Sequence, residues 1–357
     1  MRKYKVLIED AFALDNPAGI GYYTNGLYKS FEKNSDFLLC KIPEKKILHR
    51  IPNKFFKKIA YIFWLNTFFL LWLSVKKIDV VHFTNYLIPF IRLKGCKYVV
   101  TIHDLWDDKN LLPKFYGAYI KFVIRHSLKR AHTVLTVSNA IREQILREFS
   151  ISDDKVVTVY EGYEANIVIN PVAFPQHPSG YILFVGTQSK QKNIETLLRA
   201  FSDASSTYQG NLVLIGKKGD STEWIDNFIN ESQLSSRIFN MGYCSRNVVC
   251  DYMSSTSLFV FPSFYEGFGI GLLEAMSYNL RILASDIPTT KEIAGQSIHY
   301  FSPVDSYESL AREIISLTLE NKDKDADTRS QRYDAILSKL NWENSADLHM
   351  REYFRNF

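Results

Sequence analysis

Two glutamates separated by a glycine-rich turn form the pattern in this chain best suited to chemistry. Glu266 follows an apolar run and precedes glycines at the alternate positions 267, 269 and 271, and Glu274 lies in the apolar segment that comes next. Because glycines at this density destabilise a helix, we expect Glu266 on a loop and Glu274 in the first turns of a helix. Backbone N–H groups at such a helix start can bind a phosphate. The pattern predicts a ligand site, although a plain strand-to-helix turn with incidental acids would have the same composition.

A histidine and two further glycines also follow apolar runs. His103 comes directly after the run 98–102, and open α/β sheets bind ligands at the carboxyl ends of their strands. This position favours a functional role, whereas a lone histidine is more often a hydrogen-bonded structural residue. Gly19 and Gly21 follow the first apolar run after a ten-residue loop, and Thr24 stands where a dinucleotide fingerprint has its third glycine. They are weak evidence for NAD, but on a loop they would let the backbone approach a diphosphate, and we expect such a loop here.

The sequence shows no pattern of metal ligands. The four cysteines include no CxxC pair and have no histidine partner at zinc spacing, so we expect reduced thiols in a cytosolic protein. The Asp-x-Asp segments at 323–325 and 325–327 lie in a charged stretch away from any strand end. We therefore expect no metal and no cofactor.

Short apolar runs alternate with helical patterns, which predicts parallel sheets covered on both faces by helices. The predicted strands lie at residues 5–8, 79–83, 98–102, 134–137, 156–159, 181–185, 212–215, 258–261 and 281–284. A helix is predicted at 138–149, with Ser138 as its N-cap. The segment 166–180 has three prolines and little helical periodicity, which is typical of a linker. Since 357 residues are too many for one ordinary core, we expect domains at 1–165 and 181–338 and a final segment at 339–357.

Charge and hydropathy raise the question of a membrane but not of nucleic acid. The net charge of +5 comes without a compact basic block, and the three apolar residues that follow the basic N-terminus are too few for a signal peptide. Residues 59–75 are aromatic-rich and nearly uncharged, and residues 1–58 carry 12 Lys and Arg against 6 Asp and Glu. This combination predicts one long apolar helix, part core and part facing an anionic membrane, although a spanning helix or a buried helix beside a solvated basic face would also fit. The predicted membrane-surface residues are Lys54, Phe55, Phe56, Lys57 and Lys58.

The glycine-rich turn also closely resembles the signature of retaining glycosyltransferases of family 4, in the segment FVFPSFYEGFGIGLLEAM at 259–276. Further similar motifs occur in the order and spacing of that family, over most of the chain. They are GIGYYTNGL at 19–27, TIHDLW at 101–106, VLTVSNAIREQIL at 134–146, FVGTQSKQKNIETLLRAF at 184–201, SDIPTTKEIAG at 285–295, YFSPVD at 300–305 and NWENSA at 341–346. The resemblance implies the α/β fold called GT-B, in which two Rossmann-like domains face a central cleft and the final helix returns to the first domain.

The resemblance also implies roles for individual residues. Glu274 would accept hydrogen bonds from the ribose hydroxyls of a donor nucleotide, and a carboxylate suits that task because it only accepts. Glu266 and His103 would lie beside the donor sugar as catalytic residues. Lys192, six residues after Gly186, would offset charge on the leaving diphosphate. The remaining implied contacts with the nucleotide sugar are Gly19, Gly21, Gly186, Thr187, Lys190, Phe268, Gly269, Ile270 and Gly271.

The chain departs from the family pattern at three positions. Thr187 stands where many members have an arginine that contacts the diphosphate, and Lys190 is a possible substitute or an ordinary loop lysine. Gly271 replaces a proline, so the helix start loses a preset φ but keeps its N–H groups. Glu161 replaces an asparagine that often precedes the turn glycine, and the sequence suggests no role for it.

Taken as a member of this family, the chain would be a metal-independent enzyme at the cytoplasmic face of the cell membrane. It would transfer a sugar from a UDP- or GDP-sugar to a glycan or lipid-linked oligosaccharide, with retention at the anomeric carbon. Members commonly build bacterial surface polysaccharides such as O-antigen or capsule. The alternatives are a nucleotide-sugar epimerase, a phosphorylase or another GT-B enzyme, and a non-catalytic protein that binds sugar nucleotides.

Overall fold

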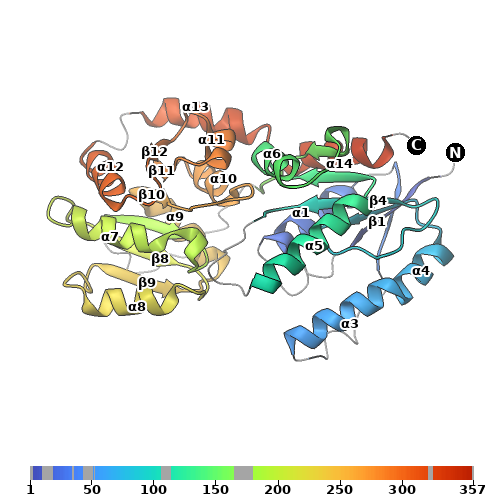
Figure 1. Cartoon of the computed structure of the whole chain (residues 1–357). Helices are drawn as coiled ribbons and strands as arrows, with labels where there is room; N and C mark the ends of the chain where they lie inside the picture. The colour runs from blue at the N-terminus through green and yellow to red at the C-terminus, as the bar shows by residue number, and fades with distance from the viewer. Residues whose placement is uncertain are drawn as a thin grey trace. The chain divides into compact units, whose positions relative to one another are not determined.

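Within its described residues, the chain forms two compact units, each with a parallel six-stranded sheet (Figure 1). The N-terminal unit comprises Met1–Gly162 and Asn341–Phe357, and the C-terminal unit comprises Tyr163–Leu340. The computed structural model describes residues 3–9, 19–33, 36–42, 51, 53–105, 114–164, 180–320 and 325–355. The predicted fold class of two doubly wound sheets is therefore confirmed. The predicted linker, except for its last residue, lies outside the described residues.

The sheet of the N-terminal unit has the strand order β2-β1-β3-β4-β5-β6. Its strands are β1 (Lys5–Glu9), β2 (Leu38–Cys40), β3 (Val80–Phe83), β4 (Lys97–Ile102), β5 (Thr133–Thr136) and β6 (Val156–Thr158). Its helices are α1 (Ile20–Glu32), α3 (Lys54–Asn66), α4 (Phe68–Lys76), α5 (Lys114–Arg130), α6 (Asn139–Glu148) and α14 (Trp342–Phe354), with the 3-10 turn η1 (Asp153–Lys155). The predicted cap of α6 is confirmed, because the Ser138 hydroxyl accepts a hydrogen bond from the Ile141 N–H at 3.3 Å. The strand order reverses between β1 and β3, so a ligand is expected near the carboxyl ends of these strands.

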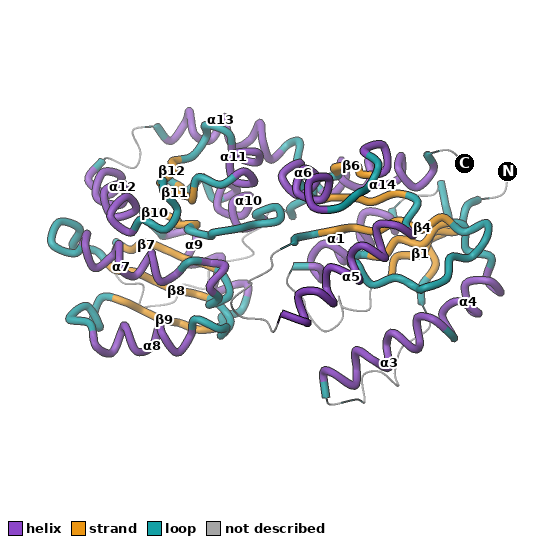
Figure 2. The backbone as a smooth tube through the Cα atoms, viewed as in Figure 1, coloured by secondary structure: helices purple, strands orange, loops and turns teal. Residues whose placement is uncertain are grey.

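The C-terminal unit repeats this architecture with the order β12-β11-β10-β7-β8-β9 (Figure 2). Its strands are β7 (Tyr181–Val185), β8 (Asn211–Ile215), β9 (Ile238–Gly242), β10 (Leu258–Phe261), β11 (Ile282–Ser285) and β12 (His299–Phe301). Its helices are α7 (Ile194–Ala204), α8 (Thr222–Glu231), α9 (Arg246–Ser255), α10 (Ile270–Ser277), α11 (Pro288–Ala294), α12 (Tyr307–Leu319) and α13 (Ala326–Leu337), with the 3-10 turn η2 (Lys190–Lys192). Here the order reverses between the paired strands β7 and β10.

A buried chain of hydrogen bonds fixes the C-terminal helix α14 within the N-terminal unit. The Nδ1 atom of His349 lies 2.7 Å from the Ser345 carbonyl, which can only accept, so Nδ1 carries the proton and Nε2 accepts from the Tyr23 hydroxyl at 2.6 Å. Tyr23 in turn accepts from Thr101, which accepts from Nε2 of His82. The remaining His82 nitrogen then accepts from the Tyr353 hydroxyl at 2.6 Å.

This chain of bonds satisfies every polar group that it contains, and burial keeps both of its histidines neutral. Burial lowers the pKa of His349 to about 4 and that of His82 well below its usual value. Gly26 of α1 also packs closely against Trp342 of α14. A Cβ on Gly26 would lie 2.1 Å from the Trp342 ring, so a larger residue would not fit between the two helices.

The apolar segment predicted as a single helix at 59–75 is broken into α3 and α4 at Thr67. The side chains at the break bond back to the helix, with the Thr67 hydroxyl donating to the Phe63 carbonyl and the Asn66 amide to the Ile62 carbonyl, each at 2.8 Å. Such local side-chain bonds compete with the helical ladder and bend helices. The prediction of one continuous helix was therefore wrong.

Helices α3 and α4 are apolar on two opposite faces. One face is buried against the unit through Tyr61, Leu65, Phe69 and Leu73, which recur every fourth residue. The other face carries large apolar side chains that are 49–69% exposed, namely Phe56, Ile59, Phe63, Phe68, Leu71 and Val75. The window Ile59–Lys76 has a mean hydropathy of 1.5 and is 22% buried, so by length and composition alone it could cross a membrane.

Candidate functional site

The glycine-rich turn lies at the carboxyl edge of the C-terminal sheet, where it connects β10 to α10. Glu266 is on the loop and is 7% exposed, and Gly269 has φ +98°, a left-handed conformation that favours glycine. Helix α10 begins at Ile270, and Glu274 lies in its second turn. The predicted placement of the two glutamates on loop and helix is confirmed.

Lys192 and Glu266 form an ion pair at the point where the strand order reverses. The Lys192 Nζ atom lies 2.6 Å from Glu266 Oε1, and the two side chains are 23% and 9% exposed. Lys192 belongs to η2, which follows β7, whereas Glu266 follows β10. The two loops are also joined through Gln191, whose carbonyl accepts from the Phe264 N–H at 2.9 Å and whose side chain donates to the Tyr265 carbonyl at 3.0 Å.

Glu274 has a different cationic partner. The Arg246 Nη1 atom donates to Glu274 Oε1 at 2.7 Å, and Glu274 is 13% exposed. Sequence reasoning missed Arg246 because it begins α9, which follows β9, a strand whose mixed polar and apolar residues were not recognised. Thr289 was missed as well, and its hydroxyl donates to the Glu266 carbonyl at 2.8 Å.

The loop after β7 contains the other residues that the sequence placed near a diphosphate. A Cβ on Gly216 would lie 1.7 Å from the Gly186 carbonyl oxygen. The backbones that follow β7 and β8 therefore pack directly against each other, with no side chain between them. Thr187 and Lys190 are exposed beside this contact, and the Lys190 N–H donates to Asp220 Oδ1 at 2.9 Å. Phe268 is buried next to Gly269.

Four buried polar atoms at this edge have no hydrogen-bond partner among the described residues. They are Gln188 Oε1, Ser221 Oγ, Ser263 Oγ and Ser285 Oγ, and each residue is at most 1% exposed. Gln188 follows β7, Ser221 follows β8, Ser263 follows β10, and Ser285 is the last residue of β11. Because nearly all buried polar groups in proteins are hydrogen-bonded, their gathering at one edge marks it as a place for a polar ligand or for water.

The N-terminal unit has its own polar group at the carboxyl edge of its sheet. His103 follows β4, and its Nδ1 lies 2.9 Å from Glu161 Oε1 while its Nε2 lies 3.1 Å from the Thr84 carbonyl. The Tyr23 ring contacts the His103 ring edge to face, with centroids 4.7 Å apart. Glu161, for which the sequence suggested no role, is therefore the partner of the predicted catalytic histidine.

The first glycine pair is arranged differently from the loop that we expected. Gly19 has φ +58° and caps α1, whereas Gly21 is buried inside that helix. The prediction that both glycines lie on a loop was therefore wrong for Gly21, because α1 begins at Ile20. The residues between β1 and Gly19 lie outside the described residues.

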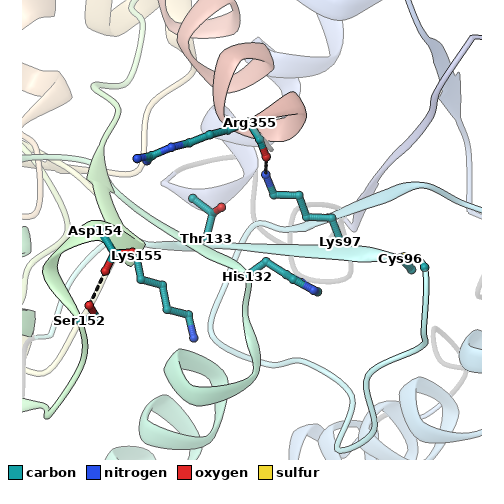
Figure 3. Close-up of a pocket in the computed structure, with 9 residues that line it drawn as sticks. Cys96, Lys97, His132, Thr133, Ser152, Asp154, Lys155 and Arg355 are labelled. Carbon is teal, nitrogen blue, oxygen red and sulfur yellow. Dashed lines mark hydrogen bonds between the residues drawn. The ribbon is translucent and has the colours of Figure 1, made fainter. Parts of the chain in front are cut away.

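A separate pocket of about 540 Å³ lies at the opposite, amino edge of the N-terminal sheet (Figure 3). Lys97, His132 and Lys155 line it. The Lys97 ammonium donates to the carbonyls of Glu352 and Arg355, at 2.7 and 2.8 Å, and Lys155 donates to those of Leu128 and Lys129. These lysines satisfy the last carbonyls of α14 and α5, so their charge serves the fold and we do not place the reaction there.

The structure describes the side chains of only some of the predicted membrane-surface residues. Phe56 is 60% exposed and Lys57 is half-buried on α3, whereas the side chains of Lys54, Phe55 and Lys58 lie outside the described residues. Among the residues that the structure describes, no three His, Cys, Asp or Glu side chains are grouped to hold a metal ion.

Two doubly wound units, each with polar residues at the carboxyl edge of its sheet, are the architecture of GT-B glycosyltransferases, and the comparisons with known proteins agree. The family model described as Glycosyltransferase Family 4 matches residues 28–166, and the model Glycosyl transferases group 1 matches residues 171–334. The chain is a glycosyltransferase that carries these two family domains, one in each unit.

Relatives give the same class, and solved structures give the same fold. The chain is 26% identical to the O-antigen chain mannosyltransferase RfbU of Salmonella typhimurium over 72% of its own length and 70% of the relative's. It is also 26% identical to the O-antigen chain mannosyltransferase B of Escherichia coli, over 77% and 74%. Its fold is similar to that of Anabaena HepE in complex with UDP, with a TM-score of 0.72, 14% identity and coverage of 98% and 99%. A sucrose-phosphate synthase from Thermosynechococcus elongatus has a TM-score of 0.71, 18% identity and coverage of 99% and 98%.

Proposed function

We propose that this glycosyltransferase moves a sugar from a nucleoside diphosphate sugar to a glycan of a bacterial surface polysaccharide such as O-antigen, with retention at the anomeric carbon. The observation that carries the proposal is the Lys192–Glu266 pair, which brings a cation and a carboxylate together at the switch point of the C-terminal sheet. The unpartnered polar atoms around it suit a polar donor. The names of the O-antigen relatives support the polysaccharide and make a mannosyl donor the first to test.

The nucleotide would bind at the carboxyl edge of the C-terminal sheet. Arg246 holds one oxygen of Glu274, which orients the carboxylate to accept from the two ribose hydroxyls. The first N–H groups of α10, after Gly269, would meet the diphosphate, since a helix start offers free donors and a partial positive charge. Thr187 and Lys190 are exposed after the end of β7 and would lie beside the phosphate oxygens.

The chemical step would depend on stabilising the leaving group. The bond between the anomeric carbon and the diphosphate oxygen breaks, and the acceptor hydroxyl forms a new bond on the same face of the sugar. The proton of that hydroxyl passes to the departing phosphate oxygen. The Lys192 ammonium, paired with Glu266 in the free protein, would offset the charge that develops on the diphosphate. Since this cation supplies the stabilisation, transfer would need no metal ion.

The acceptor is proposed to be lipid-linked, and the outer face of α3 and α4 to rest on an anionic membrane. A surface helix normally places polar residues on its outer side, so helices whose outer face is apolar as well as their buried face point to a second apolar environment. The surface continues beyond α4, because the Phe90 N–H bonds to Asn66 at 2.6 Å and its ring contacts His126 of α5. Phe90, Ile91 and Phe122 are each more than half exposed.

We favour surface contact over a spanning helix. The buried face of α3 and α4 belongs to the core of the N-terminal unit, where Phe69 packs against Phe83 of β3 with ring centroids 6.1 Å apart. Withdrawing these helices into a bilayer would expose that core. Lys57, Lys76 and Lys77 flank the apolar face and would contact anionic headgroups.

The test is a titration of UDP-, GDP- and ADP-sugars, followed by nucleotide release with and without a glycan acceptor. We expect release to require the acceptor, the product to keep the donor's anomeric configuration by NMR, and activity to persist in excess EDTA. Lys192→Met should lower the rate at least a hundredfold, as removal of one transition-state donor does, whereas the exposed Lys129→Met should not.

Three other results would contradict this function. Chemical change of the sugar without an acceptor would indicate an epimerase, and binding without turnover would indicate a non-catalytic protein. Loss of activity in EDTA that magnesium or manganese restores would overturn metal independence.

A further inference from the structure

The hydrogen bonds of His103 determine where its protons lie. Its Nε2 faces the Thr84 carbonyl, which can only accept, so Nε2 carries a proton. Its Nδ1 faces Glu161 Oε1 at 2.9 Å, and a hydrogen bond at this distance needs one proton between the two atoms. The Glu161 carboxylate and the Thr84 carbonyl therefore engage both ring nitrogens of His103 and fix the orientation of its ring.

We propose that Glu161 is a positioning residue for the transfer reaction, which fixes the orientation of the His103 ring. The proposal rests on the proposed function, in which His103 lies beside the donor sugar. Glu161 is 6% exposed and follows β6, whereas His103 follows β4, so the pair joins two strand ends of the same sheet edge. Because both ring nitrogens are engaged within the protein, the pair presents the His103 ring in one orientation at this edge.

The surroundings of the pair support this assignment. The titratable groups packed around it are Tyr23 on α1, His82 on β3 and His349 on α14. Burial lowers the pKa of both other histidines, and the charge of His103 adds a smaller effect in the same direction. They stay neutral, and the Glu161 carboxylate is the side-chain group that bonds to the His103 ring.

The first experiment measures the reaction and the binding of free nucleotide in Glu161 variants. Glu161→Ala removes the partner of Nδ1 and should lower kcat/KM for transfer at least tenfold, while the affinity for free nucleotide stays unchanged. Glu161→Gln can still bond to Nδ1 through its amide, so it should keep activity within about threefold of the wild type. The exposed Glu143→Ala on α6 is the matched control. Unchanged activity in Glu161→Ala, or a Gln variant as impaired as the Ala variant, would overturn the proposal.

A second measurement does not depend on turnover. In protein labelled with 15N-histidine, the ring-nitrogen shifts of His103 should change in Glu161→Ala and hardly change in Glu143→Ala. His103 shifts that are the same in the wild type and in Glu161→Ala would overturn the proposal even if the enzyme is active. If no sugar nucleotide supports transfer, the proposed function fails, whereas this spectrum still decides the role of Glu161.

Discussion

At the scale of single residues, Glu274 offers the most direct test of donor binding. Its carboxylate is nearly buried and is held by Arg246, so it is oriented before a nucleotide arrives. Glu274→Ala should weaken nucleotide affinity by about 1–3 kcal/mol, the range for hydrogen bonds to charged groups. Isothermal titration with free UDP and GDP measures this, with the exposed Glu223→Ala on α8 as control. Equal affinities of the two variants would exclude the ribose contact.

The residue types of this site could be predicted from the sequence, but their partners could not. Glu266 and Glu274 were placed correctly because glycine content and apolar pattern are local properties. The Lys192–Glu266 and His103–Glu161 pairs join residues 74 and 58 positions apart, and only the pairing of strands brings such residues together. Arg246 had no local signal, since the strand before it has alternating rather than continuous burial.

At the scale of elements, the strands that the sequence missed are all at sheet edges. β2 is one edge of the N-terminal sheet, and β9 and β12 are the two edges of the C-terminal sheet. An edge strand pairs on one side only and is more exposed, so it lacks the continuous apolar run that identified the central strands. The break at Thr67 was missed for a related reason, because hydropathy does not register side chains that bond back to a helix.

The outer face of α3 and α4 predicts how the protein meets a membrane. Phe63→Ser combined with Leu71→Ser should reduce binding to anionic vesicles at least tenfold, because burying each of these side chains is worth about 1.5–3 kcal/mol in full. Co-sedimentation at low and high salt measures the binding, and high salt should release much of the wild type. Lys54, Lys57 and Lys58 changed together to Glu should also abolish binding and leave nucleotide affinity intact.

The matched control for this surface is Leu319→Ser, a change of an apolar residue in the other unit that is 70% exposed. It should bind vesicles like the wild type. Wild-type protein that stays in the supernatant at low salt would exclude the surface contact. Protein that resists both salt and carbonate extraction would favour a spanning helix instead.

Helix α14 should depend on its buried hydrogen bonds. Tyr353→Phe removes the hydroxyl that donates to His82 Nδ1, and it leaves that nitrogen buried without a partner. We expect a loss of about 1–3 kcal/mol in the free energy of unfolding, the cost of one unsatisfied buried group. Urea unfolding measures it, with the exposed Tyr243→Phe as control. A loss equal to that of the control would show that packing alone fixes α14.

At the scale of the whole molecule, the buried histidines predict that the two units differ in their response to acid. The N-terminal unit contains His82 and His349, which are buried and neutral, and His132, whose pKa is lowered to about 4 by burial and then by the nearby Arg92, Lys97 and Lys155. The C-terminal unit contains His299, whose pKa is also lowered, chiefly by burial.

Each of these groups binds its proton more tightly in the unfolded chain than in the folded one. Their contribution to stability is therefore complete above the ordinary histidine pKa of 6.5 and is lost as the pH falls from 6.5 towards 4. For the fully buried His349 this amounts to about 3 kcal/mol across the window. We expect the N-terminal unit to open first on acidification. Hydrogen exchange resolved by peptide, at pH 7 and pH 5, measures this: at pH 5, after correction for intrinsic exchange, β3, β4 and α14 should lose more protection than β7, β8 and β10. Earlier loss in the C-terminal strands, or equal protection of both units at the two pH values, would contradict the assignment of neutral histidines to the core that holds α14.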